Sequence, residues 1–218
     1  MDVSKLKESE YKTTKISISF LKANTVSLVF PLPLVIIYIA IAFLAEKLLS
    51  PRPEMFGNAA RYFSMNGELP YLLLSMAIYI VIMIILIVLH ELTHAFFFMR
   101  GCENGWKSIK FGVKSLTPYC HCREATTVSI ARMSCLAPLF TVSLPLSILA
   151  IATGFPLLHL LAVVMIFSSG GDLWIIWKLR PFNGKTDLAL DMEEEIGMIV
   201  YEPIPNVSLS DISSEEKA

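Results

Sequence analysis

The stretch at residues 71–89, YLLLSMAIYIVIMIILIVL, runs for 19 residues without a charge and leads directly into His90-Glu91-Leu92-Thr93-His94. Because a helix needs about 20 apolar residues to cross the hydrocarbon core of a bilayer, this stretch predicts a membrane-spanning helix. Ionisable side chains at the end of such a helix are costly and usually serve a function. The same stretch therefore predicts the fold and marks a candidate site.

The composition of the 218-residue chain is that of a membrane protein. Hydrophobic residues make up 55% and charged residues 17% of the chain, whereas soluble domains carry about a quarter charged residues. This argues against a nucleic-acid-binding protein, a disordered chain and a secreted disulfide scaffold. Apolar stretches predict spans at about 31–48, 71–99, 133–153 and 156–178. We expect an α-helical integral membrane protein with about four transmembrane helices and a small cytoplasmic β-hairpin or sheet region.

The positions of the basic residues predict which side of the membrane each loop occupies. All but three of the 18 Lys and Arg residues (Lys47, Arg52 and Arg61) fall in segments that four spans would place on one side. Short loops rich in Lys and Arg stay in the cytoplasm. We therefore expect a multi-pass protein of the cell membrane with both termini cytoplasmic. Its parts would be a cytoplasmic N-terminal segment at 1–27, a four-span domain at 28–178 and an acidic cytoplasmic tail at 179–218.

Proline and glycine residues indicate where the spans begin, bend and turn. The first span is expected to begin near Pro31, because proline is best tolerated in the opening turn of a helix. Pro138 and Pro145 predict a kink in the third span. Gly154, followed by a Phe-Pro pair, predicts a tight turn that makes the last two spans an antiparallel hairpin.

The loop at 105–131 is expected to form a β-hairpin or small sheet. Hydrophobic and polar residues alternate at 108–113 and at 126–130, with Thr117-Pro118 between them. Residues 15–20 and 198–201 could add strands. All four cysteines fall on the predicted cytoplasmic side, where thiols normally stay reduced, so we expect no structural disulfide.

The sequence His90-Glu91-Leu92-Thr93-His94 has the spacing of a zinc site. Residues at i and i+4 share one face of a helix, with Cβ atoms about 6 Å apart, so both imidazoles can reach one tetrahedral zinc ion. A glutamate beside the first ligand can take a proton from a metal-bound water and pass it to a leaving amine. We expect His90 and His94 to bind metal and Glu91 to be the catalytic base and acid.

A catalytic zinc usually has three protein ligands, and Asp172 is the candidate for the third. It is the acidic residue of the fourth span, within SSGGD, at a similar predicted depth to His90. It could instead pair with Lys178 or Arg180. The acidic run 193–195 is a second source of a ligand. Cys120-His121-Cys122 is a weaker candidate, because neighbouring side chains of a strand point to opposite faces.

These motifs resemble those of a known family. HELTHAFFF at 90–98, TPYCHCREA at 117–125, SSGGD at 168–172 and IGMIVYEP at 196–203 are similar to those of prokaryotic four-span membrane proteins described as zincin peptidases. More distantly, the chain resembles the site-2 protease class of intramembrane metalloproteases, although it has Thr93 where these commonly have glycine. The resemblance implies zinc bound by His90, His94 and Asp172, with Glu91 as the acid and base.

The function that we expect is a membrane-embedded zinc metallopeptidase of the HExxH type, acting on a membrane protein or peptide substrate in or near the bilayer. The loop at 105–131 could hold an unwound substrate as an added strand. Nucleic acid is not an expected partner. Two other functions remain open: a zinc-binding membrane scaffold or sensor without hydrolase activity, and a metal transporter that uses His90, His94 and Asp172. Iron or cobalt in place of zinc also remains open.

Overall fold

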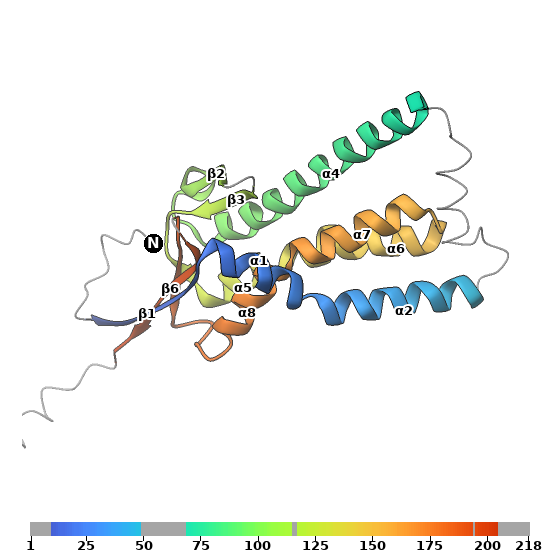
Figure 1. The fold of residues 1–218 in the computed structure, drawn as a ribbon. Helices are drawn as coiled ribbons and strands as arrows, with labels where there is room; N and C mark the ends of the chain where they lie inside the picture. Colours follow the sequence, from blue (N-terminus) through green and yellow to red (C-terminus); the bar gives the residue numbers. More distant parts are fainter. Residues whose placement is uncertain (1–9, 49–68, 115–116, 194, 205–218) are drawn as a thin grey trace, which may run out of the picture.

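The computed structural model describes residues 10–48, 69–114, 117–193 and 195–204. It is mostly helical, with a small antiparallel sheet at one end (Figure 1). Within these residues, four helical segments are long and apolar enough to cross a membrane: Thr25–Leu48, Leu73–Gly101, Val128–Thr153 and Pro156–Leu179. Parts of the expected N-terminal segment and acidic tail lie outside the described residues.

Several of these segments consist of two or more elements. The helices are α1 (Phe20–Val29), α2 (Leu32–Leu48), α4 (Leu69–Phe98), α5 (Val128–Pro138), α6 (Leu144–Thr153), α7 (Pro156–Ser168) and α8 (Gly170–Leu179), with short turns η3 (Met99–Gly101), η4 (Gly105–Ser108) and η5 (Leu139–Ser143). The strands are β1 (Tyr11–Ile18), β2 (Ile109–Lys114), β3 (Thr117–Cys122), β4 (Thr126–Thr127), β5 (Leu188–Asp191) and β6 (Ile196–Pro203).

The last two spans form a helical hairpin, as the sequence predicts. Gly154 ends α6 with a φ of 65°, a left-handed conformation that glycine adopts without strain. Pro156 lies in the first turn of α7, where its missing amide is not needed, and α6 packs against α7. In the third span the π-helical turn η5 follows Pro138 directly, so the helix is irregular at the position of that proline.

The expected strand at 126–130 is correct only for Thr126–Thr127, which form β4 and pair with β5. The partner of β2 is β3, and the two pair in antiparallel register from Ile109↔Cys122 to Lys114↔Thr117. Residues from Val128 onward are helical, because the side chain of Thr127 accepts a hydrogen bond from the backbone amide of Ile130 and caps α5. The alternating pattern at 126–130 therefore combines the two residues of β4 with the first residues of α5, whose buried side chains belong to one face of that helix.

The N-terminal elements also differ from the expectation. β1 lies earlier than 15–20, because Phe20 already begins α1. β1 pairs with β6 from Tyr11↔Pro203 to Ile18↔Ile196. The four-stranded antiparallel sheet therefore has the order β1-β6-β5-β4 and joins the two ends of the described chain.

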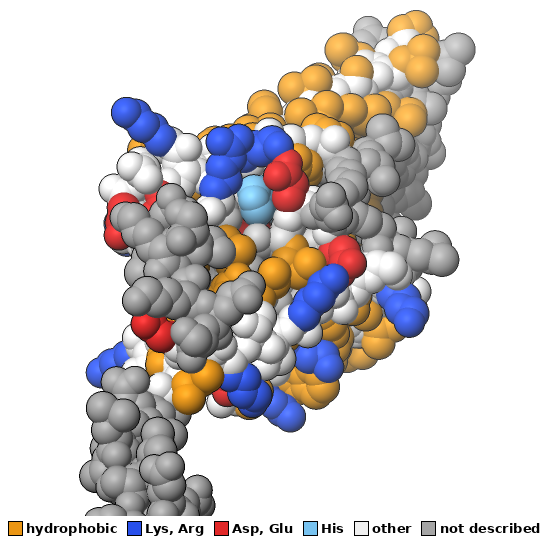
Figure 2. All heavy atoms as spheres, turned by 90° about the vertical axis from the view of Figure 1, so that its left-hand side faces the viewer, with side chains coloured by type: hydrophobic (Ala, Val, Ile, Leu, Met, Phe, Trp, Pro, Cys, Tyr) orange, Lys and Arg blue, Asp and Glu red, His pale blue; other side chains and the backbone are white. Residues whose placement is uncertain are grey.

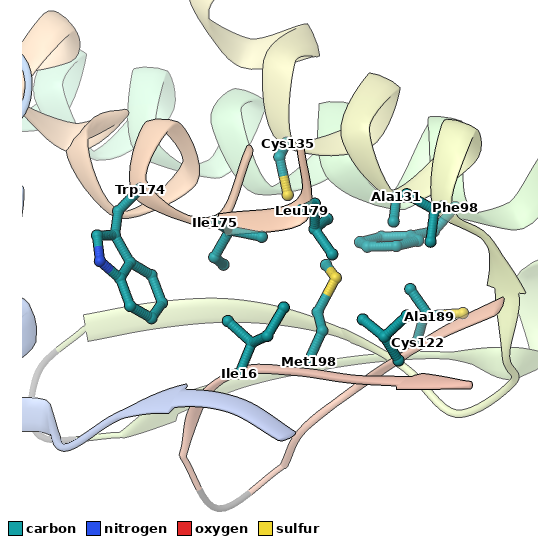
Figure 3. Close-up of a cluster of buried hydrophobic side chains, with 12 residues drawn as sticks. Ile16, Phe98, Cys122, Ala131, Cys135, Trp174, Ile175, Leu179, Ala189 and Met198 are labelled. Carbon is teal, nitrogen blue, oxygen red and sulfur yellow. The ribbon is translucent and has the colours of Figure 1, made fainter. Parts of the chain in front are cut away.

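The main hydrophobic core lies between this sheet and the helix ends above it (Figure 3). The sheet contributes Ile16, Ala189 and Met198, and these side chains face α5 and α8. Trp174, Ile175 and Leu179 of α8 are each less than 9% exposed. The sheet thus covers the ends of α5 and α8, and it holds α8 in place through its apolar face.

A second buried cluster joins the apolar helices farther from the sheet. It contains Val35 and Tyr38 of α2, Ala150 of α6, and Ala162 and Ile166 of α7. The Tyr38 hydroxyl lies 2.6 Å from Nδ1 of His159, so this histidine of α7 has a partner on α2. His159 therefore links two apolar helices and lies outside the candidate metal site.

The sheet end and the helix bundle have different surfaces. Viewed from the sheet end, Lys and Arg side chains are spread over the face, and apolar side chains cover the helices behind it (Figure 2). Many large apolar side chains of α2 and α4 are exposed, among them Ile36, Ile41, Leu74 and Ile84. This distribution agrees with a membrane protein whose sheet end faces an aqueous phase.

Candidate metal centre

The sequence HELTH is helical and belongs to the last part of α4. His90 and His94 lie one turn apart, with ring centroids 5.0 Å apart. Both imidazoles are buried, with 5% and 8% of each residue exposed. Buried ring nitrogens need hydrogen-bond or metal partners, and one residue lies close to both rings.

That partner is Asp172, which lies in the first turn of α8. The fourth span is interrupted at Ser169, whose ψ of 2° is not helical, so α8 begins anew at Gly170. Oδ2 of Asp172 lies 3.4 Å from Nε2 of His90, and Oδ1 lies 3.4 Å from Nε2 of His94. The structure thus brings together all three residues that the sequence suggests as ligands.

These distances fit a metal better than they fit direct hydrogen bonds. Hydrogen bonds between nitrogen and oxygen are about 2.9 Å long, whereas ligand atoms of a tetrahedral zinc with bonds of about 2.05 Å lie about 3.3 Å apart. Ligand atoms of His90, His94 and Asp172 all lie within 4.8 Å of one another. Oδ2 of Asp172 is buried and makes no hydrogen bond to any described residue. Two imidazoles and one carboxylate are a donor set that suits zinc.

Neighbouring groups set the orientation of each imidazole. Nδ1 of His94 lies 2.9 Å from the backbone carbonyl of Ser134. A carbonyl can only accept, so Nδ1 carries the proton and Nε2 is left as a metal donor. The Ser134 hydroxyl in turn donates to the His94 carbonyl at 3.0 Å, which joins α5 to α4 at this point.

His90 has a similar but longer contact with Ser168. The Ser168 hydroxyl donates to the Met165 carbonyl at 2.8 Å, so its oxygen is free to accept from Nδ1 of His90 at 3.4 Å. The two serines thus keep Nε2 of each histidine directed at Asp172. The sequence did not indicate the role of either serine. Serine is common in membrane helices, and the atom of Ser134 that contacts His94 is a backbone carbonyl, which every residue has.

Glu91 lies beside the two histidines on the wall of the same cavity. Cys120 of β3 lines the same cavity, so the hairpin lies beside this carboxylate. The cavity has a volume of about 210 Å³ and is bounded by α4, α8, β3 and the segment from Asp191 to Met198. It therefore holds a carboxylate, two imidazoles and free space next to a strand edge.

The segment between β5 and β6 forms part of the cavity wall and carries two of the expected acidic residues. Glu193 pairs with Lys110 of β2, and Glu195 pairs with Lys15 of β1 at 2.9 Å. These contacts lower the pKa of both carboxyl groups: the hydrogen bond from Lys110 acts on Glu193, and those from Ser17 and Lys15 act on Glu195. Both face lysines instead of the histidines, and Glu194 lies outside the described residues.

The residues of Cys120-His121-Cys122 lie in three different environments. Cys120 lines the cavity, His121 contacts Asp191 with 3.1 Å between Nδ1 and Oδ2, and Cys122 lies against Cys102. Asp191 also accepts from the Cys122 backbone amide at 3.2 Å. The tripeptide therefore does not gather around one point, and Asp191 is a cavity residue that sequence reasoning missed.

Lys178 and Arg180, the alternative partners of Asp172, have other contacts. Lys178 lies over the rings of Trp174 and Trp177, and Arg180 lies over Trp177. Asp172 is therefore directed at the histidines and not at the basic end of its own helix.

Comparison with known families adds one finding. Residues 83–185, slightly under half of the chain, match the family described as "Putative zincin peptidase". The matching region contains both histidines, Glu91 and Asp172. No match is found among curated proteins or among solved structures.

Proposed function

From the match of residues 83–185 to the zincin peptidases, we propose that this chain is a membrane-embedded zinc metallopeptidase that hydrolyses a peptide bond in or beside the bilayer. The observation that carries the proposal is the buried convergence of His90, His94 and Asp172 beside Glu91 in one cavity. Ionisable groups at the end of an apolar helix are expensive unless they are paired, and a cation held by all three residues would pair them.

In hydrolysis, different residues would bind the metal, orient its ligands and transfer the proton. His90, His94 and Asp172 would hold the ion, and Ser134 and Ser168 would keep both imidazoles in the required tautomer. When bound, zinc polarises a carbonyl and lowers the pKa of water toward about 7. Glu91 would receive the proton of the attacking water on its carboxylate and deliver it to the leaving nitrogen.

We propose further that β3 positions the substrate. Within the described residues, β2 is the only strand that pairs with β3. The second edge of β3 is therefore not paired with a strand, and it faces the cavity. On that edge the amide of Cys122 is used by Asp191, while Pro118 has no amide. The edge therefore offers mainly carbonyl oxygens, which suit the amides of an extended substrate.

The position relative to the membrane is also part of the proposal. Four apolar segments and the basic sheet end support a site in the cytoplasmic half of the bilayer, with both termini in the cytoplasm. The substrate would be a membrane protein or peptide whose chain is unwound near this face, since a peptide bond inside a helix is shielded by its own hydrogen bonds.

The Glu91→Gln variant tests the proposal. A peptidase should lose cleavage of a membrane-peptide library in proteoliposomes by at least about 100-fold, the range typical of acid and base catalysis, while keeping its bound zinc. Glu202→Gln is a matched control, because Glu202 pairs with Lys12 on the sheet and is not part of the cavity. Unchanged cleavage in Glu91→Gln would contradict the role of Glu91 as acid and base, and no cleavage by the zinc-loaded wild type would contradict catalysis and favour a scaffold.

A further inference from the structure

Two thiols outside the metal centre lie in direct contact. Sγ of Cys102, just after η3, is 3.0 Å from Sγ of Cys122 at the end of β3. A disulfide bond is about 2.05 Å long, so the sulfur atoms need to approach by only about 1 Å. Each thiol also contacts a backbone carbonyl: Phe98 for Cys102 at 3.3 Å and Glu124 for Cys122 at 3.4 Å. These contacts direct both thiols to the same place.

The two thiols differ in exposure and in acidity. Cys122 is 1% exposed, whereas Cys102 is half-buried. The hydrogen bond from Cys122 lowers the pKa of Cys102, and the same bond, together with burial, raises the pKa of Cys122. A partly exposed thiol with a lowered pKa next to a buried thiol is the arrangement of an attacking and a resolving cysteine.

We infer that Cys102 and Cys122 form a reversible oxidation site that hydrogen peroxide converts to an intrachain disulfide. The Cys102 thiolate attacks one peroxide oxygen, the O–O bond breaks, and a sulfenic acid forms while water leaves after taking up a proton. The sulfur of Cys122 then attacks the sulfenic sulfur, its proton goes to the departing hydroxide, and a second water leaves. Both thiols are oxidised by two electrons in total, and the peroxide is reduced to two waters.

The disulfide would connect the helix of the metal centre to the strand beside it. Cys102 follows the end of α4, which carries both histidines, and Cys122 ends β3, which lines the cavity through Pro118, Tyr119 and Cys120. Oxidation would therefore fix β3 against α4 and limit the opening of the cavity edge. This site does not depend on the proposed hydrolysis, because it uses neither Glu91 nor the ligands.

Peptide mapping tests the linkage directly in the full-length protein purified in detergent. Trypsin places Cys102 in the peptide 101–107 and both Cys120 and Cys122 in the peptide 115–123. The variant Cys120→Ser leaves one thiol in the second peptide, so a linked pair can only join Cys102 to Cys122. After hydrogen peroxide treatment we expect this linked pair, a loss of two free thiols per chain, and full reversal by dithiothreitol.

Two single variants test the assigned roles. In Cys122→Ser we expect a sulfenic acid at Cys102 that dimedone traps, and in Cys102→Ser we expect Cys122 to remain reduced at the same peroxide concentration. The inference would be overturned if peroxide oxidised Cys102 without producing the linked peptides in Cys120→Ser, or if the linkage joined two chains on a non-reducing gel. Equal trapping at Cys122 in Cys102→Ser would also overturn it.

Discussion

Gly170 allows α1 and α8 to approach closely, and replacing it should show how much the protein depends on that contact. A Cβ atom at Gly170 would lie 2.7 Å from Cα of Ser27 and would collide with its carbonyl oxygen. These are backbone atoms of α1, so they cannot rotate away as a side chain could. Gly170→Ala must therefore move α1 or α8, and Ser27 lines the cavity.

The neighbouring glycine provides the matched control. A Cβ at Gly171 meets only the hydroxyl oxygen of Ser27 at 3.6 Å, which is ordinary van der Waals contact. Both glycines lie in the first turn of α8, so alanine gains a similar helix propensity at each, up to about 1 kcal/mol. The difference in free energy of unfolding between the two variants cancels that gain and leaves the cost of overpacking at Gly170, about 1–3 kcal/mol.

The assay is thermal unfolding of both variants in the same detergent. In a chain of this size 1 kcal/mol corresponds to about 2–4 °C in Tm, so a difference of 2 kcal/mol places Gly170→Ala roughly 4–8 °C below Gly171→Ala. Gly171→Ala should melt at or slightly above the wild-type temperature. Equal melting temperatures for the two variants, or a more stable Gly170→Ala, would refute the close packing of α1 on α8.

Two further variants test the polar contacts around the site. Ser134→Ala keeps the backbone carbonyl that accepts from Nδ1 of His94, but it removes the hydroxyl that holds α5 against α4 at this point. Zinc affinity, measured by chelator competition, should therefore fall by roughly 10-fold or more. An unchanged affinity would show that the Ser134 hydroxyl does not help to orient His94. The pKa of Glu124 is lowered to about 2, because hydrogen bonds from Ser108, Asn104 and the Glu103 amide outweigh the opposing effect of burial. Its stabilisation is complete above about pH 4.5 and is lost as the pH falls toward about 2. Glu124→Gln should therefore lower Tm at neutral pH and make the protein less sensitive to acid in that window; an equal acid response of both proteins would contradict it.

The helical part of the fold and the residues of the candidate site could be predicted because their signals are local. An uncharged stretch of 19 residues before HELTH indicates its helix, and helical periodicity alone places His90 and His94 together. Asp172 could be proposed because a carboxylate within an apolar span is costly. Its role as a ligand remains a prediction, although the structure directs it at both histidines.

The remaining features depend on contacts that local patterns do not encode. Thr126, Val128 and Ile130 alternate as in a strand, but the cap formed by Thr127 starts a helix instead. Ser134 contacts His94 across 40 positions of the chain, through a backbone atom that every residue possesses. Cys102 and Cys122 lie 20 residues apart, and nothing in their spacing indicates that η3 and the end of β3 meet.

The most direct measurement is the zinc content of the purified, chelator-free protein and of three variants. We predict about one zinc per chain in the wild type, its loss in His94→Ala and weaker retention in Asp172→Asn. His159→Ala is the matched control, because His159 contacts Tyr38 away from the cavity and its variant should keep the metal. A folded wild type without metal, or a His94→Ala protein that binds zinc as well as the wild type, would contradict the three-ligand site.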